Sequence, residues 1–199
     1  MELEFRKNRI IFNRELSYLD KLALNFVKIL DRQGIDYVII SGYIAILFGR
    51  SRNTEDVDLF IEEMPFEKFK KLWEALEKEG FECINAFSPE EAYNDYLKEM
   101  IAIRFAVKGT FEPNFELKYP KTDLNQYSLK NKIVVELNNE KLNTSKMELQ
   151  IAFKLYLGSE KDLEDAIHLW ETFKGKLDME LFNEFARRLS VEDKIKLLE

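Results

Sequence analysis

The sequence predicts a mixed α/β fold that is followed by a helical C-terminal part. Short apolar runs of strand length alternate with helical periodicity as far as residue 143, and glycine or proline separates most of these segments. From residue 144 onward only helical periodicity remains. We therefore expect an α/β core with an N-terminal helix over residues 1–143 and a helical subdomain over residues 144–199.

The first half of the chain alternates between helix and strand. Leu19, Leu22, Phe26 and Ile29 recur at helical spacing, and Gly34 follows as a C-terminal cap. Branched and aromatic residues favour strands, and Gly or Pro marks the segment ends. The patterns predict a helix over 14–33, a strand over 35–40, a short helix over 43–48, a strand over 56–62 and a helix over 66–79.

The second half begins with strands and ends with helices. Polar turns containing Gly109, Pro113 and Pro120 separate runs of strand-forming residues. Strands are expected over 81–85, 100–107, 114–119 and 132–137, with a short helix over 89–97. Helices are expected over 146–157, 160–174, 178–189 and 191–198.

Composition narrows the class of protein. Of 199 residues 46% are hydrophobic, enough for a core, yet no apolar stretch approaches the ~18 residues that cross a bilayer. The net charge of −7 argues against wrapping of nucleic acid by overall charge, and leaves a local basic patch open. Because the first residues lack the apolar segment of a secretory signal and Cys83 is the only cysteine, we expect a cytoplasmic protein without an internal disulfide.

Two aspartates, Asp56 and Asp58, lie in a predicted strand, where aspartate is disfavoured. Side chains alternate along a strand, so both carboxylates share one face, about 7 Å apart, while Val57 and Leu59 face the core. This arrangement suits divalent metal ions that bridge a phosphate. The alternative is a solvated edge strand whose acids guard against aggregation.

A turn at Ser41-Gly42 ends the preceding strand. A glycine between strand and helix lets a phosphate approach the free backbone N–H groups, and the Ser41 hydroxyl adds a donor. The simpler interpretation is that Gly42 only allows the bend. The segment is not a P-loop, because the spacing to Gly49 is wrong and Arg50-Ser51 stands where Lys-Ser/Thr is required.

The spacing of these two features carries a resemblance. Residues 35–62 resemble the nucleotidyltransferase superfamily, the DNA polymerase β-like fold. They contain a hydrophobic strand, the Ser41-Gly42 turn and, after thirteen intervening residues, an acid-x-acid strand. The form Arg52-x-Thr54-x-Asp56-x-Asp58 looks like its AbiEii-type toxin and minimal nucleotidyltransferase branch. The family usually has Gly where this chain has Ser41. The resemblance implies a mixed sheet flanked by helices.

The resemblance also implies two-metal phosphoryl transfer from an NTP with Mg²⁺ or Mn²⁺ held by Asp56 and Asp58. The family needs a third carboxylate from a later strand, as a metal ligand or as a base. Glu116, between Phe115 and Leu117, is the first candidate, and Glu136 is its competitor. Lys118 shares a face with Glu116, and either contacts a phosphate or forms a surface salt bridge.

The resemblance implies further nucleotide-binding residues, both before the acid pair and after the last predicted strand in the sequence. Arg52 and Thr54 either touch the triphosphate or only support the loop. Lys154, with Asp162 and Asp165, is similar to the family's C-terminal Lys-Leu … Lys/Arg-Asp-x-x-Asp element, in which the lysine contacts the phosphates and the acids position it or the metal. Helical spacing puts the two acids on one face.

The function expected from this resemblance is transfer of a nucleoside monophosphate to an acceptor hydroxyl on tRNA, a protein or a small molecule. Membership of a toxin–antitoxin pair, with an antitoxin as partner, is part of that expectation. A local basic patch of Lys118, Lys121, Lys130 and Lys132 would favour a nucleic acid. The alternative is a catalytically inactive nucleotide- or partner-binding protein on the same scaffold. His168 and Cys83 are expected to be structural.

Overall fold

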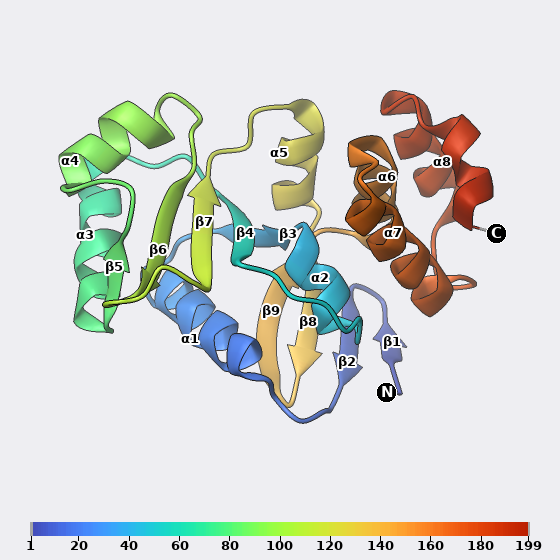
Figure 1. Ribbon diagram of the computed structural model, residues 1–199, viewed down its shortest axis with the longest axis horizontal. Helices are drawn as coiled ribbons and strands as arrows, with labels where there is room; N and C mark the ends of the chain where they lie inside the picture. The colour runs from blue at the N-terminus through green and yellow to red at the C-terminus, as the bar shows by residue number, and fades with distance from the viewer. Residues whose placement is uncertain (1, 199) are drawn as a thin grey trace.

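A computed structural model describes residues 2–198, and its framework is a mixed sheet flanked by helices (Figure 1). This confirms the predicted fold class. Within the described residues the sheet has nine strands in the order β1-β2-β8-β9-β3-β4-β7-β6-β5. The strands are β1 Glu4–Arg6, β2 Arg9–Phe12, β3 Tyr37–Ile40, β4 Asp56–Ile61, β5 Phe81–Cys83, β6 Ile103–Val107, β7 Asn114–Lys118, β8 Ile133–Leu137 and β9 Glu140–Thr144.

Each predicted helix has a helical counterpart, although residues 92–97 form a π-helical turn and residues 192–198 a 3-10 helix. The short helix α5 was not predicted, and neither were the strands β1, β2 and β9. The helices are α1 Tyr18–Arg32, α2 Gly42–Leu47, α3 Phe66–Lys78, α4 Pro89–Glu91, α5 Asp123–Lys130, α6 Met147–Leu157, α7 Glu160–Phe173 and α8 Met179–Arg188, with a π-helical turn η1 Ala92–Leu97 and a 3-10 helix η2 Glu192–Leu198.

Strand β4 lies inside the sheet. It pairs antiparallel with β3 on one side and parallel with β7 on the other. Val57 and Leu59 of β4 are fully buried, as their alternation predicts. The interpretation of the acid pair as edge-strand protection is therefore wrong, because β4 has no open edge.

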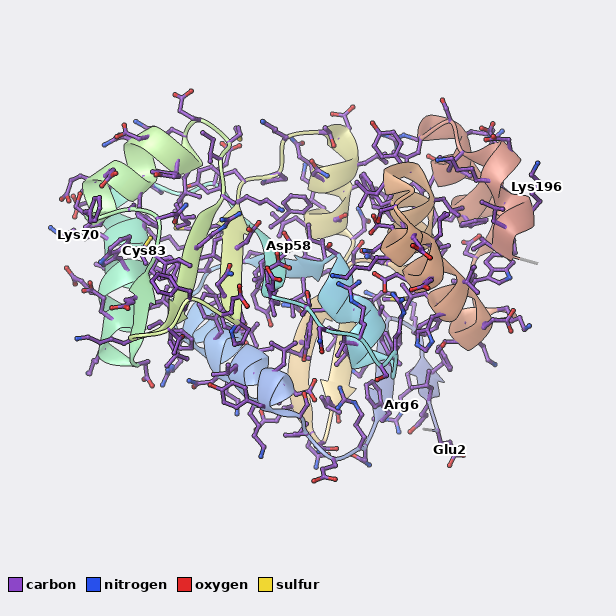
Figure 2. The ribbon with its side chains drawn as sticks, viewed as in Figure 1. Glu2, Arg6, Asp58, Lys70, Cys83 and Lys196 are labelled. Carbon is purple, nitrogen blue, oxygen red and sulfur yellow. The ribbon has the colours of Figure 1, made fainter. Side chains whose placement is uncertain are left out.

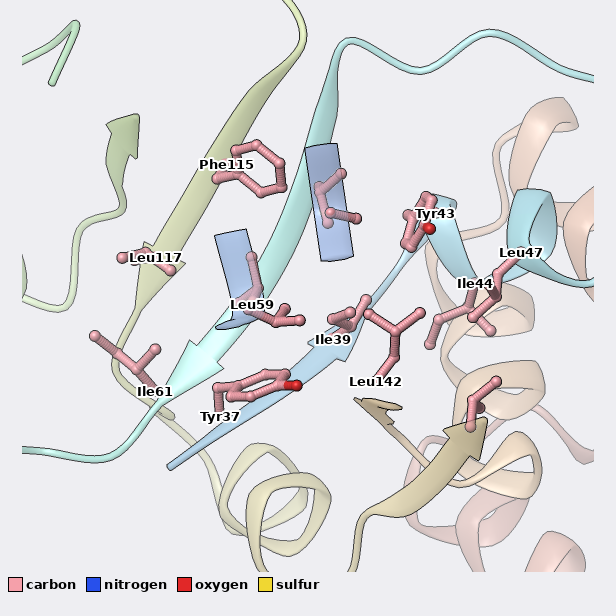
Figure 3. Close-up of a cluster of buried hydrophobic side chains, with 14 of the residues drawn as sticks. Tyr37, Ile39, Tyr43, Ile44, Leu47, Leu59, Ile61, Phe115, Leu117 and Leu142 are labelled. Atoms are coloured by element: carbon pink, nitrogen blue, oxygen red, sulfur yellow. The ribbon is translucent and has the colours of Figure 1, made fainter. Parts of the chain in front are cut away.

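Helix α1 covers one face of the central strands. Its Phe26 ring stacks on Phe115 of β7 with ring centroids 4.1 Å apart, and meets Phe81 edge-on at 5.2 Å. Figure 3 shows Phe115, Leu59 and other side chains of this core. Aromatic pairs of this kind add to the burial energy that fixes a helix on a sheet. The opposite face of β4 and β7, which carries the acids, is left for the functional site.

Helices α6, α7 and α8 pack together at one end of the sheet (Figure 1). One continuous buried cluster includes side chains of the strands and of these helices, such as Leu149, Ile151 and Leu155 of α6. The boundary between residues 143 and 144 stays a prediction. No helix within residues 2–198 combines the length and the apolar character that a membrane span requires.

Candidate active site

The register of β4 and β7 brings two of the predicted acids together. Asp58 pairs directly with Glu116, and Asp56 pairs with Asn114. The side chains of Asp58 and Glu116 are each 13% exposed. Because residues two apart in a strand share a face, Asp56, Asp58 and Glu116 all belong to the same face of the sheet.

The competing acid Glu136 lies elsewhere. It belongs to β8, and strands β9 and β3 separate β8 from β4, which is a distance of roughly 14 Å at the usual strand spacing. Its carboxylate accepts a hydrogen bond from Arg9 at 3.1 Å. Strand order therefore favours Glu116 over Glu136 as the neighbour of the acid pair.

Cations accompany two of the three acids. The Lys118 ammonium donates to Asp58 at 2.7 Å and lies 3.9 Å from Glu116. The Arg104 guanidinium, on the neighbouring strand β6, donates to Glu116 at 2.7 Å. Lys118 thus forms the salt bridge that was one of its two predicted roles, and its ammonium lies near both carboxylates. Figure 2 labels Asp58.

Asp56 has a different environment. The Thr54 hydroxyl lies 3.1 Å from the Asp56 carbonyl oxygen and 3.3 Å from its carboxylate. No cationic side chain within residues 2–198 pairs with Asp56. Thr54 therefore supports the loop that leads into β4, and the Asp56 carboxylate keeps most of its capacity as an acceptor.

The turn after β3 is held in an unusual backbone conformation. Ser41 has φ 65° and ψ −141°, a region that glycine adopts readily and other residues rarely. Its backbone N–H donates to the Gln150 side-chain oxygen at 3.2 Å, and the Gln150 amide nitrogen donates to the Ser41 carbonyl at 3.0 Å. This explains why a turn of this shape favours Gly first, and how Ser41 is accommodated.

Gly42 packs closely against a side chain from the loop before β4. A Cβ on Gly42 would lie 2.6 Å from Nη2 of Arg52. The guanidinium of Arg52 occupies the space that the missing Cβ leaves, and the phosphate role of Gly42 stays a prediction. Gly42 therefore serves the close packing of Arg52 against the first turn of α2.

Arg52 belongs to a buried ion-pair network that joins the loop before β4 to α7. Asp165 is fully buried and pairs with Arg50, Arg52 and Lys154, the last at 2.9 Å. Lys154 also donates to Asp162 at 2.7 Å. The structure thus brings Lys154, Asp162 and Asp165 together, and it places Arg52 among them.

The ionisation of Asp162 reflects these partners. Burial alone would raise the pKa of Asp162, but hydrogen bonds from Lys154 and Ser159 outweigh it and lower that pKa. Asp162 is therefore held as a carboxylate beside the Lys154 ammonium, whose side chain is only 3% exposed. The network holds the Lys154 side chain in a fixed position at the edge of a cleft.

This cleft has a volume of about 190 Å³ and lies between β3, β4, β7, α5 and α6. Four of the predicted site residues line it, namely Ser41, Asp58, Lys118 and Lys154. The other predicted residues lie outside its lining: Asp56, Glu116, Gly42, Arg52, Thr54, Asp162 and Asp165. The cleft also has an apolar wall made by Ile40, Phe60, Phe153 and Leu157.

Comparison with known proteins places this architecture. No protein-family model matches the chain, and no curated protein matches it. Among solved structures, a nucleotidyltransferase-like antigenic protein from Paracoccidioides brasiliensis matches with a TM-score of 0.53 at 21% identity, covering 89% of this chain and 90% of that one. ANT(2″)-Ia in complex with adenylyl-2″-tobramycin matches with a TM-score of 0.54 at 15% identity, covering 86% and 99%.

A lincosamide antibiotic adenylyltransferase, bound to lincomycin, matches with a TM-score of 0.50 at 12% identity over 80% of this chain and 99% of that one. The chain has a nucleotidyltransferase-like fold. At these identities the likeness establishes the fold alone. It agrees with the fold that the residues of 35–62 imply.

The donor set of this nucleotidyltransferase-like fold suits a divalent cation by its chemistry. Carboxylate oxygens are the ligands that Mg²⁺ prefers, and the Lys118 ammonium already supplies positive charge between Asp58 and Glu116. Within residues 2–198, however, no three side chains of His, Cys, Asp or Glu lie close enough together to hold a metal ion as they stand. For a metal to bind all three carboxylates, Lys118 has to move aside.

Sequence reasoning missed several residues that line the cleft. Gln150 and Phe153 lie on α6 within one turn of Lys154, but neither carries a charge that marks it as a site residue. Asn125 and Ser128 come from α5, whose polar composition hid it; the signal that would have revealed α5 is the capping box of Thr122 with Asn125.

The two residues expected to be structural have structural contacts. A ring nitrogen of His168, Nε2, lies 3.1 Å from the Phe48 carbonyl oxygen, so the ring links α7 to the end of α2. Burial raises the pKa of the Cys83 thiol, which keeps it protonated and a poor nucleophile.

Proposed function

We propose that the protein transfers a nucleoside monophosphate from a nucleoside triphosphate to an acceptor hydroxyl. The observation that supports this most is the pairing of Asp58 with Glu116 across β4 and β7, with Asp56 on the same face and Lys154 in the adjoining cleft. Carboxylates grouped in this way on interior strands are costly to a fold and are expected at functional sites.

The proposed roles follow from the contacts. Asp56, Asp58 and Glu116 would hold Mg²⁺ or Mn²⁺, which would neutralise phosphate charge and stabilise the charge on the attacking and leaving oxygens. The Lys154 ammonium, fixed by its two acids, is placed to attract the triphosphate, and the Ser41 hydroxyl offers a donor at the cleft. Lys118 is proposed to exchange Asp58 for a phosphate oxygen.

The bond changes balance without any redox partner. The acceptor oxygen bonds to the α-phosphorus, the bond from that phosphorus to the bridging oxygen breaks, and pyrophosphate leaves. The acceptor proton passes to a base, for which Glu116 is the proposed residue. Arg52 and Thr54 act at a distance: Arg52 ties the Gly42 turn to Asp165, and Thr54 braces Asp56.

For the acceptor we propose only a chemical class. Two of the structural neighbours hold an antibiotic or its adenylylated form, lincomycin in one and adenylyl-2″-tobramycin in the other, which supports a small molecule as one class of acceptor. The Arg52-x-Thr54-x-Asp56-x-Asp58 motif supports the AbiEii-type branch, with tRNA or a protein as acceptor and an antitoxin as partner. A cytoplasmic location is proposed because the substrate is an NTP.

The second candidate is a catalytically inactive nucleotide- or partner-binding protein. The observation that favours it is the pairing of Asp58 with Lys118 and of Glu116 with Arg104. These cations would then be permanent replacements for the metal. The two candidates share the nucleotide site and differ in whether a label is transferred.

Transfer of α-³²P label from each NTP into the RNA, protein and small-molecule fractions of a cell extract tests the proposal. Label should appear in one fraction with the wild type and be lost with Asp56→Asn and Asp58→Asn, while Glu136→Gln, an acid of β8 remote from the pair, retains it. Persistent Mg²⁺-dependent stabilisation by NTP, measured by thermal shift without any label transfer, would establish the inactive binder instead.

A further inference from the structure

A groove on another part of the molecule gathers positive charge. The predicted patch of lysines beside the cleft is partly neutralised, since Lys118 pairs with Asp58 and Lys132 with Asp36. The groove, of about 400 Å³, lies between the β1–β2 hairpin, the start of α6 and the α7–α8 connection. Its charged lining consists of Arg6, Lys7, Arg9, Lys146, Lys176, Glu148 and Asp178.

Three of these cations are uncommitted. The two arginines each pair with a glutamate outside the lining, at 2.7 and 3.1 Å. Lys7, Lys146 and Lys176, which we call the groove lysines, pair with no acid within the described part of the chain. Both acids of the lining accept hydrogen bonds from backbone N–H groups, Glu148 at 2.9 Å and Asp178 at 3.1 Å. The groove lysines are therefore available to an anionic ligand.

An aromatic side chain accompanies the groove lysines. Phe5 is 37% exposed, and its ring packs in a T-shaped arrangement on Phe173 with centroids 6.0 Å apart. The Lys176 ammonium lies 5.6 Å from the centre of the Phe5 ring. Lysines that follow a backbone, combined with an exposed ring on which a base stacks, are the features of single-strand binding sites.

The groove is next to the candidate active site. Lys146 lines the groove, whereas the preceding residue Ser145 lines the cleft, and Gln150 one turn later also lines the cleft. The first turn of α6 therefore separates the two cavities, and a helix is only about 10–12 Å across. A chain lying in the groove would pass within reach of the cleft.

We propose that this groove binds a single-stranded nucleic acid, with the groove lysines on its phosphates and Phe5 against a base. The overall charge of −7 opposes such a ligand everywhere else, so binding depends on this local cluster. An acidic polypeptide would satisfy the lysines but offers no base to stack on the Phe5 ring, which Lys176 also contacts. The proposal concerns binding and does not require nucleotidyl transfer.

Fluorescence anisotropy with labelled oligo(U) and oligo(dT) of about ten nucleotides tests the groove with the full chain. Because three phosphate contacts on a single strand give a salt slope of about −2, affinity should fall roughly 20-fold between ~50 and ~200 mM salt. The variant Lys7→Gln/Lys146→Gln/Lys176→Gln should lose this salt dependence and bind roughly 20-fold more weakly at the lower salt.

A matched control changes the charge equally at the far end of the molecule. Lys70→Gln/Lys71→Gln/Lys78→Gln, on α3, should bind as the wild type does (Figure 2 shows Lys70 far from Arg6 of the groove). Phe5→Leu should weaken binding about fivefold without changing the salt slope, because only stacking is lost. Binding of both oligonucleotides, or of RNA alone, supports the proposal.

Three results would overturn the proposal. The first is no binding of either oligonucleotide at low salt, and the second is equal weakening of binding by both triple variants. The third is binding of labelled polyglutamate that neither oligonucleotide displaces. The assay contains no NTP, so its failure leaves the proposed transfer reaction intact. Conversely, an inactive enzyme that binds the oligonucleotide through the groove lysines leaves this proposal standing.

Discussion

Gln150 of α6 holds both backbone polar groups of Ser41, which lies 109 residues earlier in the chain. The two hydrogen bonds, of 3.2 and 3.0 Å, join the turn after β3 to the helix that carries Lys154. Gln150 is 4% exposed, so its amide has few other partners available. The contact fixes the distance between the Ser41 turn and the lysine across the cleft.

This relationship predicts a coupling between the two positions. Ser41→Gly should stabilise the protein by about 1 kcal/mol, because glycine adopts the Ser41 backbone conformation without strain. Gln150→Leu should cost about 2 kcal/mol, since it leaves the Ser41 N–H and C=O without partners. Urea denaturation of both variants and of the double variant measures the coupling.

In the double variant the loss from Gln150→Leu should be smaller, because a relaxed turn can turn its polar groups towards water. Strictly additive free energies would show that Gln150 does not hold the turn in its conformation.

The close contact between Gly42 and Arg52 predicts that a larger residue at position 42 disturbs the buried ion pairs. In Gly42→Ala the new methyl group would lie 2.6 Å from Nη2 of Arg52, so the guanidinium has to shift and its pairing with Asp165 is weakened. We expect a loss of about 2 kcal/mol in unfolding free energy, below the ~3–5 kcal/mol of a fully broken buried pair, because Asp165 retains Arg50 and Lys154.

The control for Gly42→Ala is Arg52→Met, which empties the guanidinium position first. In that background the added methyl group should cost clearly less than in the wild type, as measured by chemical denaturation. An unchanged cost would mean that the alanine acts through the backbone and not through Arg52.

Lys118 predicts competition between an internal cation and an added one. Lys118→Met removes the ammonium 2.7 Å from Asp58. Without metal the variant should be less stable, because neighbouring carboxylates then repel one another. Its affinity for Mg²⁺ should rise roughly tenfold, since the ion no longer competes with a bound ammonium. Calorimetric titration with Mg²⁺ in the absence of nucleotide measures this.

Arg9→Met provides the comparison, because it frees Glu136 in the same way on a strand away from the acid pair. Mg²⁺ binding that rises equally in both variants would contradict a metal site at Asp58.

Asp20 predicts part of the pH dependence of stability. Its fully buried carboxylate accepts from Arg14 at 2.6 and 2.8 Å and from the Tyr43 hydroxyl at 2.8 Å. Burial alone would raise the pKa of Asp20, but hydrogen bonds from Arg14, Ser17 and Tyr43 outweigh it and lower that pKa. A group whose pKa is lower in the folded state stabilises fully above its ordinary value and loses this contribution as the pH falls below it.

Urea denaturation at a series of pH values checks this. Asp20→Asn should be less stable than the wild type at neutral pH, and the difference should shrink as the pH falls through the ordinary aspartate value of 3.8. A difference that stays constant as the pH falls well below that value would show that the Asp20 charge does not matter.

Local patterns predicted most of the fold. Helical spacing in 14–33 and in the segments after 144, and the apolar alternation around Asp56 and Asp58, were enough because these elements bury one face each. The strands β1, β2 and β9 escaped prediction. They are short or polar, as Glu140–Thr144 is, and β9 forms because it pairs with β8 and β3.

The sequence by itself determined the alternation of helices and strands, the shared face of Asp56 and Asp58, and the turn at Ser41-Gly42, because each depends on residues close together in the chain. Only the tertiary structure decided that β4 is interior, that Glu116 and not Glu136 stands beside Asp58, and that Arg52 fills the space at Gly42. These outcomes depend on strand order and on ion pairs between distant segments, which no local periodicity encodes.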